Sequence, residues 1–342
     1  MIRKAIAALS FLALAHAAHA TDLTVVSFGG DNKNAQAKAF YEPFMKSTGI
    51  NVVASEYNGE MAKVKAMVDT RSVSWDVVEV EAPELARGCS DGQFERLDYS
   101  KIVNGSDVIA GGVKPCGVGI FVWSTVLAYN ADKIKQAPTS WADFWDVKKY
   151  PGKRALRKGA KFTLEIALLA DGVAPNNVYK VLSTPEGVTR AFRKLDQIKP
   201  SIQWWEAGAQ PAQYLASGDV VMSSAYNGRV TKAQSEGQNL QIVWNNNLYA
   251  LDYWAIPRGD AKKDDALKFI AFATNPANQK TFAQTIPYGP ASKQAVTLLG
   301  TANAKDLPTA PKNLSTAVAI DADFWTDYGE NLEQQFNAWA AK

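Results

Sequence analysis

The chain has 342 residues, of which 47% are hydrophobic and 21% are charged, and its formal net charge is +3. A chain of this length exceeds what one hydrophobic core ordinarily supports, so two lobes are expected. The near-neutral charge offers no basic face of the kind that nucleic-acid binding requires.

The first twenty residues have the organisation of a secretory signal peptide. Arg3 and Lys4 precede a short apolar run, and the stretch ends with small residues in an A-x-A pattern. We therefore expect residues 1–20 to be removed and the mature chain to begin near Thr21, in the periplasm. An N-terminal membrane anchor is the alternative, but the apolar run is too short to span a bilayer comfortably.

Removal of this segment changes the chemistry that is available to the mature chain. Its net charge falls from +3 to +1, because Arg3 and Lys4 leave without any acid. The only two histidines, His16 and His19, leave as well. Without histidine there is no Ser-His-Asp or Cys-His nucleophile, no histidine general base and no imidazole metal site.

Two cysteines remain in the mature sequence, Cys89 and Cys116. In an exported protein an isolated pair is expected to form one disulfide, which stabilises the fold by about 3–4 kcal/mol in the chain-entropy model. Two separate buried thiols are the alternative. Residues 88–92, GCSDG, match the G-x-S-x-G pattern, but such a nucleophile needs a histidine partner, so the match is interpreted as chance.

The first part of the mature chain alternates between strand and helix. Strands are predicted at 23–28, 50–57 and 75–82, and helices at 31–48 and 60–71. This β-α-β-α-β order predicts a parallel sheet with helices on both faces. Ligands of such sheets lie outside the carboxyl ends of the strands.

Four residues come at or just after those carboxyl ends and are therefore candidate ligand-binding residues: Phe28, Gly29, Tyr57 and Glu81. The glycine can bring bare backbone close to a ligand.

The later part of the chain continues the alternation without a low-complexity linker. A long strand-rich stretch covers 118–130, and a helix capped by Ser140 follows. Residues 211–230 predict a helix, a strand and a turn, two further strands fall within 241–257, and 260–285 is helical. Two lobes without a linker imply that the chain crosses between them more than once.

Seven sequence features resemble, in the same order, the spermidine/putrescine-type substrate-binding proteins of ABC importers. They are SFGG, WDVV, SWADFWD with YPGKRAL, WWEAGAQPAQYLASGDVVM, AYNG, LDYWAIP and IPYGPAS. The resemblance covers essentially the whole mature chain. It implies an α/β, two-lobed periplasmic-binding-protein fold of type II, with mostly parallel sheets and hinge strands between the lobes.

The same resemblance implies how the chain is divided and what it contacts. Lobe 1 would comprise 21–129 with 253–292, and lobe 2 would comprise 130–252 with 293–342. The ligand would lie between the lobes and close the hinge. The implied partner is an inner-membrane ABC permease, and the implied protein is a monomer that has no cofactor.

Polyamine-binding members of that family hold a flexible cation with carboxylates at both ends and aromatic rings along its chain. Tyr226 occupies the position of the aromatic residue before Asn-Gly, and Asp252 that of the acid before Ala-Ile-Pro. A buried carboxylate is costly unless it is paired, and a ligand ammonium would provide the pair. The alternatives are a turn-capping role for Tyr226 and, for Asp252, a solvated strand end or a structural ion pair.

The other end of the expected cleft departs from the polyamine pattern. The family's acids are missing at 159–162, where the sequence reads GAKF, although Glu165 lies near enough to replace one of them. Arg229 lies instead on the same turn as Tyr226, and its planar guanidinium suits a carboxylate and repels a polyamine. Together with Asp252 it predicts a zwitterionic ω-amino acid such as 4-aminobutyrate or 5-aminovalerate.

Other roles and ligands remain open from the sequence. Arg229 would alternatively lie on the surface or pair with Asp252 or Glu206. Trp205 is a weaker candidate for the cleft, since one of the adjacent tryptophans Trp204 and Trp205 should face it. Tyr288 is another weaker candidate. A polyamine is the second ligand class. A ferric ion is the third, disfavoured by the absence of a Tyr-Tyr pair, and an enzyme is disfavoured because no Gly-rich phosphate loop occurs.

Overall fold

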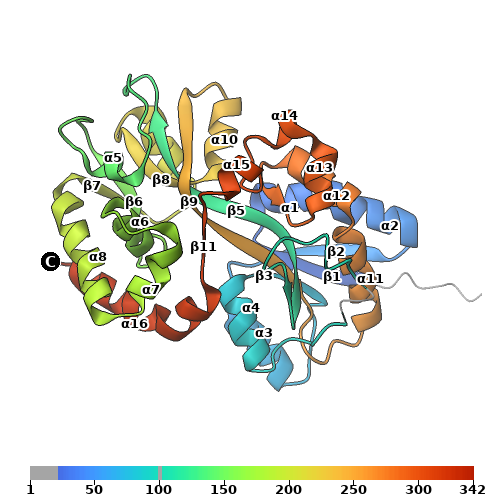
Figure 1. Cartoon of the computed structure of the whole chain (residues 1–342). Coiled ribbons are helices and arrows are strands. Elements are labelled where there is room, and N and C mark those ends of the chain that lie inside the picture. The colour runs from blue at the N-terminus through green and yellow to red at the C-terminus, as the bar shows by residue number, and fades with distance from the viewer. Residues whose placement is uncertain (1–21, 99–101) are drawn as a thin grey trace, which may run out of the picture.

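The computed structural model describes residues 22–98 and 102–342 and shows two lobes joined by long strands (Figure 1). The predicted signal peptide, residues 1–20, lies outside the described residues. Within the described ranges, no helix is both long and apolar enough to cross a membrane.

The first lobe contains the predicted β-α-β-α-β unit. Strand β1 (Asp22–Ser27) pairs in parallel with β2 (Asn51–Glu56) and with β3 (Val77–Glu81). The connecting helices are α1 (Gly30–Gln36), a π-helical turn (Ala37–Tyr41), α2 (Glu42–Thr48) and α3 (Met61–Asp69), followed by α4 (Ala82–Ser90). The carboxyl ends of the three strands thus meet at one edge, as the sequence predicts.

The second lobe has the same plan. Strand β6 (Arg154–Arg157) pairs in parallel with β7 (Ile202–Trp205) and with β8 (Met222–Tyr226). Its helices are α5 (Trp141–Trp145), α6 (Thr163–Ala170), α7 (Val178–Leu182), α8 (Pro185–Ile198), α9 (Gln210–Ser217) and α10 (Asn227–Ser235).

Two long strands belong to both lobes. Strands β5 (Gly117–Asn130) and β9 (Leu240–Ala255) are antiparallel, and they join the halves in the order β2-β1-β3-β9-β5-β8-β6-β7. The two strands predicted within 241–257 are therefore one, which passes through Asn246 at φ 54°, a conformation that asparagine tolerates. The parallel strands lie toward the edges, and the crossing strands are antiparallel. The chain passes from the first lobe to the second along β5 and returns along β9, so it crosses between the lobes more than once, as predicted. The short strand β11 (Val318–Ala319) pairs with β9.

The C-terminal helices complete both lobes. They are α11 (Lys263–Ala273), α12 (Pro276–Thr285), α13 (Lys293–Leu299), α14 (Thr301–Ala304), α15 (Pro311–Leu314) and α16 (Ala322–Ala340). Short strands β4 (Val113–Lys114) and β10 (Gly289–Pro290) pair with β5. Helix α13 packs on α12, and α16 packs on α4 of the first lobe. The division into 21–129 with 253–292 and 130–252 with 293–342 stays a prediction.

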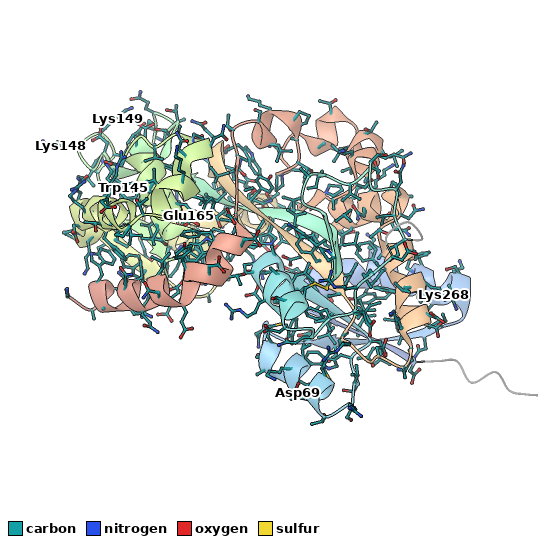
Figure 2. The ribbon with its side chains drawn as sticks, turned by 60° about the horizontal axis from the view of Figure 1, so that its bottom comes forward. Asp69, Trp145, Lys148, Lys149, Glu165 and Lys268 are labelled. Atoms are coloured by element: carbon teal, nitrogen blue, oxygen red, sulfur yellow. A yellow bond between two sulfur atoms is a disulfide. The ribbon has the colours of Figure 1, made fainter. Side chains whose placement is uncertain are left out.

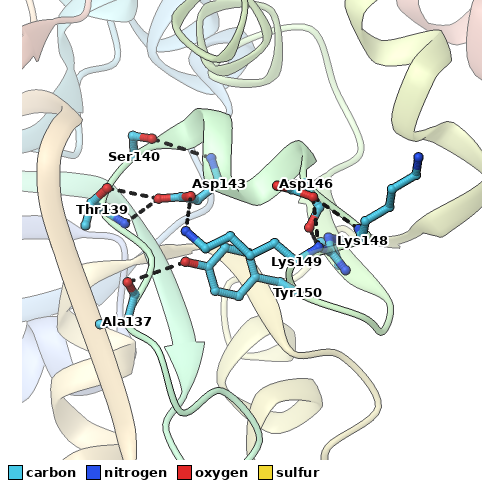
Figure 3. A network of polar contacts seen from close by, with 9 residues as sticks. Ala137, Thr139, Ser140, Asp143, Asp146, Lys148, Lys149 and Tyr150 are labelled. Carbon is cyan, nitrogen blue, oxygen red and sulfur yellow. Dashed lines mark hydrogen bonds and ion pairs between the residues drawn. The ribbon is translucent and has the colours of Figure 1, made fainter.

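Local sequence signals explain several of these elements. The Ser140 hydroxyl accepts a hydrogen bond from the backbone N–H of Asp143 and caps α5, as predicted (Figure 3). The Asp143 carboxylate in turn accepts from the Thr139 backbone N–H at 2.7 Å and pairs with Lys149 at 3.4 Å. The cap therefore fixes the entry of the chain into the second lobe after its first crossing.

Cys89 and Cys116 form the predicted disulfide, which ties the end of α4 to the strand β5 region. Residues 88–90 of the GCSDG match lie inside α4 rather than on a strand-to-helix turn. This placement agrees with the interpretation of that match as chance.

Glu165 lies in α6 of the second lobe (Figure 2) and is not among the residues that line the cavity between the lobes. Its Oε1 accepts hydrogen bonds from the Tyr179 hydroxyl at 2.9 Å and from Trp325 Nε1 of α16 at 2.8 Å. Burial raises the pKa of this carboxyl to about 7. Its place in the fold is to hold α16 against the second lobe.

We predict that Glu165→Gln stabilises the protein at pH 8. The folded-state pKa lies above the unfolded value, so the wild type loses stability as pH rises from about 4.5 through 7, by on the order of 3 kcal/mol. Glutamine keeps an acceptor for Trp325 and carries no charge. Urea unfolding at pH 5 and pH 8 measures the difference, with the exposed Glu330→Gln as control. A Glu165→Gln variant less stable than wild type at pH 8 would contradict the prediction.

Candidate ligand-binding site

A cavity of about 240 Å³ lies between the lobes beside the two crossing strands. It is smaller than the sites that hold drug-sized molecules and suits a small ligand. Its lining comes from both lobes and from β5 and β9, and consists of Phe28, Gly29, Asn32, Glu81, Phe121, Trp123, Gly208, Tyr226, Arg229, Asp252 and Tyr288.

Most of the residues selected from the sequence meet at this cavity. Those that line it are Phe28, Gly29, Glu81, Tyr226, Arg229, Asp252 and Tyr288. Gly29 has φ 76°, a left-handed conformation that glycine adopts without strain and that allows the turn from β1 into α1.

Two of the selected residues lie behind the lining. Tyr57 stacks on Phe28 with ring centroids 5.2 Å apart, and its hydroxyl donates to the Glu79 carbonyl oxygen. Trp205 is buried behind Tyr226, at 5.4 Å between ring centroids. The expectation that one of the adjacent tryptophans faces the cleft therefore differs from the structure, since Trp204 also packs elsewhere, on helix α16.

Three carboxylates gather where β3 pairs with β9, and two of them, Glu81 and Asp252, line the cavity. The antiparallel register places Glu81 directly opposite Asp252, and Glu79, two residues earlier, lies on the same face of the sheet. Asp252 is only 4% exposed, and its Oδ1 accepts a hydrogen bond of 2.8 Å from Trp123 Nε1. Glu79 is fully buried and accepts from the Asn32 side-chain amide at 2.9 Å.

The electrostatics of this acid cluster, Glu79, Glu81 and Asp252, disfavour full ionisation. Burial raises the pKa of Asp252 well above its usual range, and the charges of Glu79 and Glu81 raise it further. Burial also raises the pKa of Glu79, although hydrogen bonds, including those from Gln36 and Asn32, oppose that effect. A cation placed beside Asp252 would offset both the cost of burying the ionised carboxylate and the repulsion from its neighbours.

Aromatic rings form the walls beside the acid cluster. Phe121 stacks on Tyr288 with centroids 5.0 Å apart, and Trp123 meets Tyr226 edge to face at 5.2 Å. Gly228 is required next to Tyr288, because a Cβ there would lie 2.7 Å from that ring. The walls therefore present rings that suit a cation and an alkyl chain.

The cavity lining also contains a basic group. Arg229 lies in the first turn of α10, and its side chain is 43% exposed. Its Nη1 is 3.5 Å from Asp31 Oδ2 of α1, and Lys232 Nζ is 2.9 Å from the same oxygen. Arg229 therefore pairs with Asp31, rather than with Asp252 or Glu206, and this pair connects the two lobes.

Asn227 fixes the start of α10 against the hinge. Its Oδ1 accepts from the Ser124 backbone N–H at 2.9 Å, and its Nδ2 donates to the Pro287 carbonyl at 2.7 Å. The N-terminus of this helix, with its partial positive charge, thus stays beside Arg229 at the cavity.

Sequence reasoning missed Asn32, Phe121, Trp123 and Glu79. Glu79 could have been predicted, because its spacing from Glu81 in one strand places both side chains on the same face. Trp123 and Phe121 lie in an entirely buried strand, where no alternation of polar and apolar residues shows which face meets a ligand.

Comparison with known proteins identifies the family. Residues 39–312 match the family model described as bacterial extracellular solute-binding protein. The chain belongs to this family. Together with the relatives and solved structures that follow, this match confirms the prediction of a polyamine-type solute-binding protein of the two-lobed type II fold.

Curated relatives extend over nearly the whole chain. A gamma-aminobutyric acid-binding protein of Pseudomonas aeruginosa is 60% identical over 334 residues, covering 98% of this chain and 95% of the relative. The spermidine/putrescine-binding periplasmic protein of Escherichia coli is 26% identical over 280 residues, covering 79% and 78%.

Solved structures show the same arrangement of this solute-binding fold. A GABA receptor structure has a TM-score of 0.85 and 37% identity, covering 94% of this chain and 98% of the other. A binding protein of Agrobacterium tumefaciens in complex with glucopine has a TM-score of 0.83 and 31% identity, covering 94% and 100%.

We predict that Glu79→Gln lowers the pKa of Asp252, because it removes the like charge that raises this pKa most while the burial of Asp252 stays the same. A pH titration of the protein labelled with ¹³C at the aspartate carboxyl carbons measures this value. Glu84→Gln, which removes another buried acid beside Glu81, serves as the control and leaves Asp252 largely unchanged. An unchanged Asp252 titration in Glu79→Gln would contradict the assigned repulsion.

Proposed function

We propose that this protein is the periplasmic solute-binding component of an ABC importer and captures an ω-amino acid of the 4-aminobutyrate type between its lobes. The observation that carries the proposal is that the cavity lining contains both a carboxylate, Asp252, and a guanidinium, Arg229. A ligand with one ammonium and one carboxylate matches these two groups.

The ammonium would lie at the acid cluster. Among the described residues, no lysine or arginine forms an ion pair with Asp252, whose hydrogen-bond donor is the neutral Trp123 Nε1. An ammonium there would form charge-assisted hydrogen bonds with the carboxylate and contact the faces of the aromatic walls, worth ~0.5–2 kcal/mol for each cation–π contact. It would also displace the proton that burial and repulsion favour on Asp252.

The carboxylate would lie at Arg229. The guanidinium offers two parallel N–H donors, and the nearby start of α10 adds a partial positive charge. The pair that Arg229 forms with Asp31 is long and half-exposed, so it contributes little and is readily exchanged for a ligand.

The relatives support the same ligand class. The protein with 60% identity is a gamma-aminobutyric acid-binding protein, and a solved neighbour with 37% identity is a GABA receptor. The polyamine-binding relatives are only 26% identical. A dication would also bring a second positive charge into a cavity whose lining already includes Arg229, and charge repulsion opposes its binding.

The proposal also covers export, oligomeric state and delivery of the ligand. We infer that residues 1–20 direct export and are cleaved, that the mature protein acts as a monomer in the periplasm, and that it delivers ligand to an inner-membrane permease without turning it over. The membership of the family of extracellular solute-binding proteins supports export and a transport role.

Calorimetry of residues 21–342 against 4-aminobutyrate, 5-aminovalerate, putrescine, spermidine and glutamate tests the proposal. We expect one or both ω-amino acids to bind far more tightly than the diamine, the triamine and glutamate. Asp252→Asn should weaken that binding by about 2–5 kcal/mol, because it leaves the ammonium without its buried partner. Tighter binding of putrescine than of either ω-amino acid would refute the assigned ligand class.

A matched pair of substitutions tests the carboxylate end. Arg229 and Lys232 both pair with Asp31, but only Arg229 lines the cavity of about 240 Å³. We expect Arg229→Ala to lower the affinity for 4-aminobutyrate at least about tenfold, or ~1.4 kcal/mol, and Lys232→Ala to change it by less than about threefold. Equal losses in the two variants would show that Arg229 acts through Asp31 rather than on the ligand.

A further inference from the structure

A lysine of the second lobe reaches into the acid cluster of the first. Lys161 lies in the loop between β6 and α6, and its Nζ is 3.0 Å from Glu81 Oε2. Both side chains are largely buried, with 18% and 30% of their surface exposed, and Glu81 itself lines the cavity. Burial opposes the charged form, but Glu81 and Glu84 outweigh it and raise the pKa of Lys161, so the group stays an ammonium.

The loop that carries Lys161 is held firmly in place. The carboxylate of Glu333 in α16 accepts hydrogen bonds from the backbone N–H groups of Ala160, at 3.0 Å, and Lys161, at 3.3 Å. Phe162 has φ 73°, a left-handed conformation that a bulky residue adopts only when its surroundings enforce it. Its ring lies 5.5 Å from that of Trp123 and 5.6 Å from Lys161 Nζ.

We propose that Lys161 is a specificity-determining residue, which supplies from the protein itself the second ammonium that a diamine would otherwise bring to the acid cluster. The inference rests on the proposed function, since it explains how an ω-amino acid is chosen over a diamine. Three carboxylates in one cleft would ordinarily favour a polycation. Lys161 satisfies Glu81, while Glu79 and Asp252 repel each other's charge, so the cluster has room for one further ammonium.

The position of Lys161 gives this role a competitor. The Lys161–Glu81 pair also connects the lobes. A pair that only favoured closure of the lobes would raise the affinity for every ligand by the same factor. A specificity role instead changes the ratio of two affinities. The dissociation constants of 4-aminobutyrate and putrescine, measured on the same variant, therefore separate the two roles.

Calorimetry of Lys161→Met with both ligands is the decisive experiment. We expect the ratio of affinities to move toward putrescine by about 10- to 100-fold, because Glu81 becomes a free carboxylate for a second ligand ammonium. Lys161→Met combined with Glu81→Gln should restore a ratio close to that of the wild type. Lys158→Met, which removes a neighbouring lysine that pairs with exposed Glu206, is the matched control and should leave the ratio unchanged.

The outcomes are distinguishable. An unchanged ratio in Lys161→Met, or one that the added Glu81→Gln does not reverse, overturns the specificity role while wild-type binding of 4-aminobutyrate still upholds the proposed function. Failure of the wild type to bind any ω-amino acid refutes the proposed function directly, and tighter wild-type binding of putrescine than of either ω-amino acid overturns both. Circular dichroism verifies folding, and Lys161→Gln, which keeps a donor but no charge, decides the question if the methionine variant is unfolded.

Discussion

The antiparallel pairing of β3 with β9 brings carboxylates from distant parts of the chain onto one buried face. Buried carboxylates that repel one another are tolerated only when hydrogen-bond donors and cations surround them. The neighbouring elements meet this requirement in different ways. Asn32 and Gln36 of α1 donate to Glu79, Trp123 of β5 donates to Asp252, and the second lobe contributes an ammonium to Glu81.

The rest of the cavity follows from the same constraint. Since the acid cluster lies beside strands shared by both lobes, the second lobe can supply charges only from loops and helix starts that face it. The start of α10 supplies Arg229, and the loop before α6 supplies Lys161. The cavity thereby acquires basic groups beside its acids.

Much of this arrangement could be predicted from the sequence because it depends on local pattern. The alternation of strands and helices placed Phe28, Gly29 and Glu81 at one edge, and the structure gathers them at the cavity. Arg229 and Asp252 were found from the motifs around them. The disulfide follows from the number of cysteines together with the expected export of the chain.

The parts that escaped prediction depend on contacts between distant segments. The role of Glu79 requires knowing that β3 pairs with β9, and the role of Lys161 requires knowing that two lobes close on each other. Trp204 and Trp205 are adjacent in a strand and point in opposite directions, which predicts that one of them faces the cleft. The structure instead gives both faces of β7 a core to pack against, so neither ring reaches the ligand cavity.

The long crossing strands have a kinetic consequence. Trp123 and Asp252 lie on β5 and β9, which belong to both lobes and would therefore shift least if the lobes separated. Arg229 and Lys161 travel with the second lobe. Under the proposed function, an ammonium would therefore bind the open protein first, and the crossing strands would set the rate of capture. The residence time would depend on the second lobe, whose separation from the first would remove Arg229 from the ligand carboxylate and so release the ligand.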